Sequence, residues 1–66
     1  MRLKLNGREE EFPDIRTAMD LLTKLGIERE RVAVMINDDV IRRAALGETE
    51  IHEGDCVEVI TMVGGG

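Results

Sequence analysis

The stretch CVEVITMVGGG, residues 56–66, is the most informative part of the chain because it joins a β-strand pattern to a run of glycines. Apolar side chains recur at every second position of residues 56–63, which is the spacing of a strand with one buried face. The face expected in the core carries three valines: Val57, Val59 and Val63. The opposite face carries Glu58, Ile60 and Met62. Since Glu58 is expected to face water, Ile60 and Met62 are predicted to be partly exposed.

Three glycines, Gly64, Gly65 and Gly66, follow this strand. Glycine loses much backbone entropy when it is ordered and has no side chain to pack, so this run is a poor end for a structural strand. It suits a narrow tail that enters a channel in another protein and carries a terminal carboxylate about 10 Å beyond the strand. We therefore predict a folded domain over residues 1–63 and a flexible tail over residues 64–66. The alternative is a frayed or engineered end.

Size and charge restrict the function. A chain of 66 residues makes one small domain with little room for a substrate pocket, so an enzyme acting alone is not expected. The formal net charge of -5 argues against nucleic acid or an anionic membrane as partner and fits attraction to a basic protein surface. The sequence shows neither a signal peptide nor an apolar run long enough to span a membrane. These features predict a cytoplasmic protein, monomeric when free, that binds no metal and no cofactor itself.

The N-terminal part predicts a β-hairpin. Leu3 and Leu5 alternate with polar neighbours, and the pair Asn6-Gly7 is a strong signal for a two-residue hairpin turn. Residues 8–12 are expected to return as the second strand.

A helix is predicted next. Thr17, followed by Asp20 three positions later, has the pattern of a helix N-cap, and Gly26 stands where a C-cap belongs. The expected inward face has apolar residues at helical spacing: Ala18, Leu21, Leu22 and Leu25.

Further strands follow the helix. Residues 31–36 are almost all apolar, which predicts a strand in the middle of the sheet. A turn at 37–39 and a short strand at 40–41 come next, and residues 44–50 are expected to form a loop with one helical turn. Ile51 is expected to reach the core.

The order of two strands, a helix and two further strands before a diglycine end resembles the ubiquitin-like β-grasp fold, an α+β architecture with a mixed sheet of about four to five strands (ββαββ) packed on one helix. More narrowly, the chain is similar to the ThiS family of sulfur carriers in thiamine biosynthesis. The residues that carry this likeness are Val32-Ala33-Val34, Ile36-Asn37, Val40, Arg43, Glu53-Gly54-Asp55, Val57-Glu58-Val59 and Val63-Gly64-Gly65-Gly66. The chain departs from the pattern in its third glycine and in the acidic run Glu9-Glu10-Glu11.

The resemblance implies that a ubiquitin-activating-type adenylyltransferase, using MgATP, adenylates the carboxylate of Gly66. Sulfur from a persulfide, such as that of a cysteine desulfurase, would then form a thiocarboxylate, and a thiazole synthase would accept the sulfur. ATP must be held by the partner, since the chain has no phosphate-binding glycine loop. The implied site therefore consists of the reactive Gly66 and a partner-binding set: Ile60, Met62, Val63, Gly64, Gly65 and Gly66.

Two other functions fit the same pattern. The small subunit of molybdopterin synthase is a carrier with the same fold and terminal chemistry, although such chains usually run longer. A ubiquitin-like modifier or binding domain without sulfur chemistry is the third possibility.

Three other residues are weaker candidates for a site. His52 is expected on a surface turn rather than in a catalytic or metal site. Cys56, the only cysteine, is expected to be a small buried side chain rather than a nucleophile. Arg43 is expected either to orient its loop or to meet a carboxylate of a partner.

Overall fold

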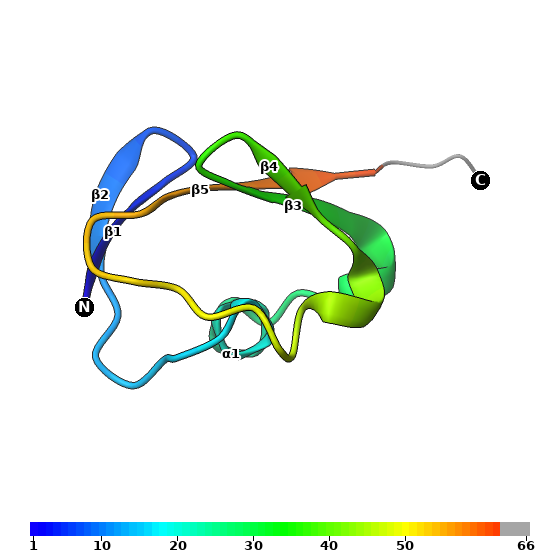
Figure 1. Ribbon diagram of the computed structural model, residues 1–66, viewed down its shortest axis with the longest axis horizontal. Coiled ribbons are helices and arrows are strands. Elements are labelled where there is room, and N and C mark those ends of the chain that lie inside the picture. Colours follow the sequence, from blue (N-terminus) through cyan, green and yellow to red (C-terminus); the bar gives the residue numbers. More distant parts are fainter. Residues whose placement is uncertain (63–66) are drawn as a thin grey trace.

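The computed structural model, which describes residues 1–62, is built around a five-stranded sheet with one helix against it (Figure 1). The strands are β1 (Arg2–Leu5), β2 (Arg8–Glu11), β3 (Val32–Ile36), β4 (Asp39–Ile41) and β5 (Cys56–Thr61). Their order in the sheet is β2-β1-β5-β3-β4, with β1 and β5 parallel and all other neighbours antiparallel. This mixed sheet on a single helix confirms the predicted α+β, ubiquitin-like β-grasp architecture.

The middle strand of the sheet is β5, whereas the sequence predicted residues 31–36 for that place. β3 is an interior strand between β5 and β4, and its side chains alternate between buried and half-buried. The prediction was wrong because an apolar run identifies an interior strand without saying which one is central. The parallel pairing of β1 with β5, which brings together segments from near the two ends of the described chain, makes β5 the middle.

In each of the two hairpins, a tight turn with positive φ connects the strands. Asn6 and Gly7, at φ 50° and 83°, join β1 to β2. Asn37 and Asp38, at φ 50° and 74°, join β3 to β4. These angles are those of type I′ turns, whose twist matches that of paired strands and which favour Asn, Asp and Gly. The structure thus confirms both predicted turns.

The helix α1 (Ala18–Leu25) begins and ends at its predicted caps. Thr17 Oγ1 accepts a hydrogen bond from the Asp20 N–H (3.1 Å), and Asp20 Oδ2 accepts one from the Thr17 N–H (3.0 Å), which completes a capping box. Gly26 ends the helix at φ 72°, a conformation in which a residue with a Cβ would be strained. The face that packs on the sheet is the predicted one: Ala18, Leu21, Leu22 and Leu25.

The capping box makes part of the stability depend on pH. Hydrogen bonds from the backbone of Thr17 and then of Arg16 lower the pKa of Asp20 from its usual 3.8. A lowered folded-state pKa means that this stabilisation is present above the unfolded-state pKa and is lost as the pH falls through the folded-state pKa. We expect Asp20→Asn to melt at a lower temperature than the wild type at neutral pH, and at the same temperature in acid below both pKa values. Asp14→Asn controls for the lost charge; a gap in melting temperature that persists in acid would contradict the assignment.

The core lies between α1 and the sheet. Three residues predicted for it, Val57, Val59 and Ile51, are buried. Ile15 and Leu46 are buried as well, and the sequence did not predict them because they lie in irregular segments without a periodic pattern. Surface loops therefore contribute to a core that the regular elements alone would leave open on the side of the helix.

Two short 3₁₀ turns complete the connections. η1 (Arg29–Arg31) leads from α1 into β3, and η2 (Arg43–Ala45) is the helical turn expected in the loop after β4. Both lie at the end of the molecule where β5 stops (Figure 1). No helix among residues 1–62 is long and apolar enough to cross a membrane.

Candidate functional site

The expected site has two parts, a tail and the strand end that carries it. Val63, Gly64, Gly65 and Gly66 lie outside the described residues, so the reactive end and the boundary between residues 1–63 and 64–66 remain predictions. The described part of the site is the C-terminal end of β5 and the sheet face around it.

The end of β5 is firmly held by β3. The strands pair in register from Val32↔Thr61 to Ile36↔Val57. One more hydrogen bond, from the Met62 N–H to the Arg31 carbonyl (2.8 Å), continues the ladder past the end of β5. The backbone that leads into the tail is therefore part of the sheet up to Met62, so the tail starts from a rigid base.

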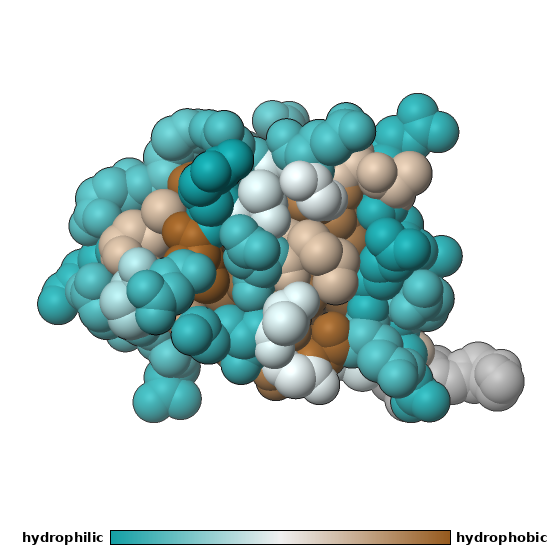
Figure 2. Space-filling view, turned by 90° about the horizontal axis from the view of Figure 1, so that it is seen from below, coloured by the Kyte–Doolittle hydropathy of each residue, from teal (hydrophilic) through white to brown (hydrophobic). Residues whose placement is uncertain are grey.

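An apolar patch covers the sheet face that α1 leaves free. Ile60 and Met62 are 47% and 53% exposed, as predicted. Strand pairing places Ala33 beside Ile60, and Val40, 68% exposed, beside Met35. We call these five residues the outer patch. On the face that carries the helix, seen in Figure 2, hydrophilic residues surround a band of apolar and intermediate ones.

The start of β5 is fixed by side chains of the hairpin turn between β3 and β4. Asn37 Nδ2 donates to Asp55 Oδ1 (3.0 Å), and Asn37 Oδ1 accepts from the Cys56 N–H (3.0 Å). The second oxygen of Asp55 accepts from the His52 N–H (2.8 Å). Asn37 and Asp55, which carry part of the family likeness, therefore fix the conformation of the chain at the start of β5. The sequence gives no local sign of the bond between Asn37 and Asp55, because the two residues lie 18 positions apart.

Arginines gather at the end of the molecule where β5 stops. Arg43 Nε donates to the Arg29 carbonyl (3.3 Å), so Arg43 ties η2 to η1, as one of its two predicted roles requires. Arg29 and Arg31 form ion pairs with neighbouring glutamates. Within residues 1–62, Arg42 and Arg43 have no carboxylate within ion-pair distance. This end is thus locally basic on a chain of net charge -5, and the second predicted role, contact with a partner's carboxylate, stays open to Arg43.

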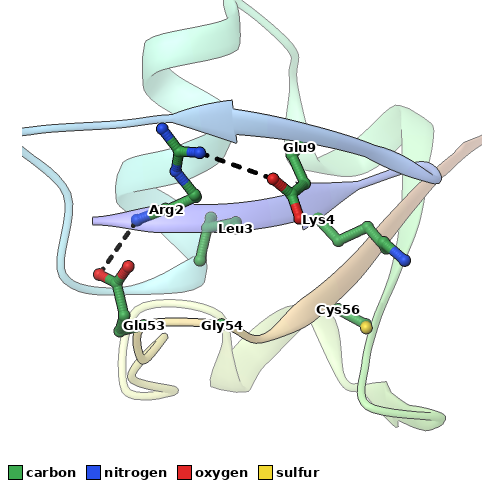
Figure 3. A pocket seen from close by; sticks show the side chains of 7 residues that line it. All are labelled: Arg2, Leu3, Lys4, Glu9, Glu53, Gly54 and Cys56. Atoms are coloured by element: carbon green, nitrogen blue, oxygen red, sulfur yellow. Dashed lines mark hydrogen bonds and ion pairs between the residues drawn. The ribbon is translucent and has the colours of Figure 1, made fainter.

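A shallow hollow of about 280 Å³ lies at the other end of β5 (Figure 3). The Arg2 guanidinium forms an ion pair with Glu9 (3.6 Å), and the backbone N–H of Arg2 donates to the Glu53 carboxylate (3.1 Å), so both glutamates already have partners within the chain. Lys4 and Cys56 extend at its other side. Such a hollow offers no enclosed, apolar binding site.

Cys56 itself corrects a prediction. It is exposed, whereas the sequence predicted a buried side chain. The reason is its place in the alternation of β5, since Cys56 shares the helix-free face with Glu58 and Ile60. His52 is exposed on its turn, which confirms its predicted surface position.

The sheet order, the single helix and the exposed end of the middle strand define a β-grasp protein of the ubiquitin-like class. Within that class, the ThiS family model matches residues 2–66, and the chain belongs to the ThiS family.

Known relatives agree with this assignment. The sulfur carrier protein ThiS of Bacillus subtilis is 34% identical over 65 residues, covering 97% of this chain and 98% of that protein. A crystal structure of a thiamine biosynthesis protein (ThiS) from Geobacter metallireducens superposes with a TM-score of 0.85 at 32% identity, over the whole of both chains. A thiazole synthase of Paramagnetospirillum magneticum is 32% identical over 66 residues, and this chain spans 20% of its length.

These comparisons confirm the predicted family and fold. Two sulfur carrier proteins ThiS, from Bacillus subtilis and Thermus thermophilus, and a thiamine biosynthesis protein (ThiS) from Geobacter metallireducens carry in their names the function that the sequence predicts.

Proposed function

We propose that this chain carries sulfur for thiazole formation as a thiocarboxylate on a C-terminal Gly66. The observation that supports this most is the match to the Bacillus subtilis sulfur carrier over 98% of that protein. The geometry agrees, because a strand that is hydrogen-bonded up to Met62 presents whatever follows it at a defined place.

The chemistry explains why a carrier needs a partner that binds ATP. A carboxylate is a poor electrophile, whereas its mixed anhydride with AMP has a good leaving group that sulfur can displace. The hollow beside Arg2 and Glu9 is shallow and lined by side chains of both charges, and the sequence has no phosphate-binding glycine loop. MgATP is therefore assigned to a ubiquitin-activating-type adenylyltransferase. This chain is its protein substrate rather than an enzyme.

The acceptor that we assign is a thiazole synthase. Segments within two thiazole synthases, from Paramagnetospirillum magneticum and Magnetococcus marinus, match the whole of this chain while it spans 20% of each. The presence of a similar segment in the polypeptide of a thiazole synthase supports an interaction between this chain and a thiazole synthase. The sulfur donor is assigned by chemistry alone as a persulfide, such as that of a cysteine desulfurase.

Conversion of the purified chain tests the proposal. The chain is incubated with the activating enzyme, MgATP and a persulfide donor, and intact-mass spectrometry should show one oxygen exchanged for sulfur at Gly66. An unchanged mass under conditions that convert a known carrier would overturn the proposal.

The outer patch is the surface through which we expect both the activating enzyme and the acceptor to bind. Ile60 gains little from the core yet lies close to the tail, so its burial against a partner would contribute about 1.5–3 kcal/mol. We expect Ile60→Asp to weaken both complexes by about tenfold or more, measured by titration calorimetry, without unfolding the chain. Because both partners would use one surface, they should also compete for the carrier.

Thr23→Asp is the matched control, since it adds the same charge at an exposed position on α1. It should leave both affinities unchanged. Unaltered binding of Ile60→Asp to both partners would remove Ile60 from the docking surface, and an unfolded variant would show that Ile60 contributes to the core.

A further inference from the structure

The middle strand β5 is paired along its whole length on one side only. On the β3 side the ladder runs from the Asn37 N–H, which donates to the Cys56 carbonyl, to the Met62 N–H, which donates to Arg31. On the β1 side, strand pairing covers only Lys4↔Cys56 and Leu5↔Val57. β5 runs on past the hairpin turn at which β1 ends (Figure 1).

Asn6 makes the last contacts on that side. Its N–H donates to the Val57 carbonyl (2.9 Å), and its Oδ1 accepts from the Val59 N–H (2.9 Å). The chain then turns back through Gly7 at φ 83° and leaves β5. The side chain of Asn6 thus takes the place that a further carbonyl of β1 would hold and ends the ladder.

Past the contacts with Asn6, three backbone groups of β5 point to the β1 side. In antiparallel strands the N–H and C=O of one residue point the same way, and successive residues alternate. Since Met62 faces β3, the Thr61 N–H and C=O face the β1 side, as does the Val59 C=O. Among residues 1–62, the Thr61 N–H has no hydrogen-bond partner, and Thr61 is exposed. We call these three groups the open edge.

The open edge differs from the two outer edges of the sheet. β2 carries Arg8 and three glutamates along its edge, and β4 is only 3 residues long; charge and shortness are the usual means by which proteins prevent strand addition. At the open edge the neighbouring side chains are uncharged: Ile60, Thr61 and Met62. The sheet is therefore protected at its margins and accessible beside the strand that leads to the tail.

We propose that the open edge pairs with an extended segment of the thiazole synthase, which adds a strand beside β5. This rests on the proposed function, and the thiazole synthase is the occupant because segments within two thiazole synthases match the whole of this chain. Main-chain pairing recognises an extended backbone whatever its side chains are. It also sets the position of the reactive carboxylate, because a slip in register by two residues would move Gly66 by about 7 Å along the strand direction.

A proline substitution tests the proposal. Thr61→Pro removes the N–H of the open edge and fills the edge with its ring, yet it removes no hydrogen bond to β3, because Thr61 and Val32 form a non-hydrogen-bonded pair. Thr61→Val keeps the N–H and is the matched control. In titrations with the thiazole synthase of the same organism, Thr61→Pro should bind about tenfold more weakly, and Thr61→Val should bind like the wild type.

Hydrogen exchange on the wild-type complex gives a second measurement that does not depend on a folded variant. The Thr61 amide should exchange rapidly in the free chain and become protected in the complex, whereas the Met62 amide should be protected in both. A Thr61 amide that stays unprotected in the complex would overturn the proposal, as would full affinity of a folded Thr61→Pro variant.

Two further outcomes separate this proposal from the function on which it rests. A wild-type chain that gains sulfur but does not bind the thiazole synthase overturns strand addition and leaves the carrier function standing, whereas a chain that never gains sulfur overturns the function. If sedimentation shows a wild-type dimer that Thr61→Pro dissociates, the occupant is a second copy of this chain and the assignment to the thiazole synthase is wrong.

Discussion

Appending one alanine after Gly66 is expected to abolish sulfur loading while leaving the fold intact. The added residue turns the Gly66 carboxylate into an amide, which cannot be adenylated, and it moves the new terminus about 3.3–3.6 Å further along the chain. It also introduces a Cβ where a glycine backbone was expected to fit a narrow channel. Intact-mass spectrometry after incubation with the activating enzyme, MgATP and the persulfide donor would measure the loss, and thermal melting would check the fold.

Cys56→Ala is the matched control for this experiment. Cys56 is exposed, so it is chemically able to take up sulfur from a persulfide, but it lies at the start of β5, at the end away from the tail. We expect Cys56→Ala to be loaded like the wild type. Normal loading of the extended chain together with failure of Cys56→Ala would place the sulfur on the thiol and contradict the proposed chemistry.

Leu21→Ala is expected to lower the free energy of unfolding by about 2–5 kcal/mol, the range for removal of a large aliphatic side chain from a packed core. Leu21 is only 1% exposed and packs between α1 and the sheet. The free energy of unfolding of a small domain is about 5 kcal/mol or somewhat more, so this loss would remove a large part of it. Urea denaturation of the wild type and the variant measures the difference.

Two controls separate the folded body from the tail. Thr23→Ala removes an exposed side chain from the same helix and should change stability by less than about 0.5 kcal/mol. Gly65→Ala should leave the unfolding curve nearly unchanged, because the tail is not expected to contribute to the core. Equal losses for Leu21→Ala and Gly65→Ala would contradict the division between domain and tail.

Local signals in the sequence account for most of the regular elements. The pair Asn6-Gly7 predicts its turn because both residues accept positive φ. Thr17 and Asp20 predict the helix start because they satisfy free N–H groups within one turn of chain. These interactions span a few residues, so the sequence itself contains both partners.

Part of the candidate site could also be predicted from local signals in the sequence, and part could not. The exposure of Ile60 and Met62 followed from the alternation of one strand, and the structure confirms it. The glycine tail and its reactive end come from the sequence alone, since the described residues stop at Met62. The prediction of a buried Cys56 was wrong, because the general tendency of cysteine to be buried does not hold at a position that the same alternation puts on the exposed face of Glu58.

Contacts between distant segments required the tertiary structure. The place of β5 in the middle of the sheet, the bond from Val59 to Asn6 across 53 residues and the bond between Asn37 and Asp55 leave no periodic trace, because each depends on which strands become neighbours. The open edge beside Thr61 is of this kind too, since it exists only because β1 turns away before β5 ends. A strand's own residues specify its faces; its edges are specified by what the rest of the chain brings alongside.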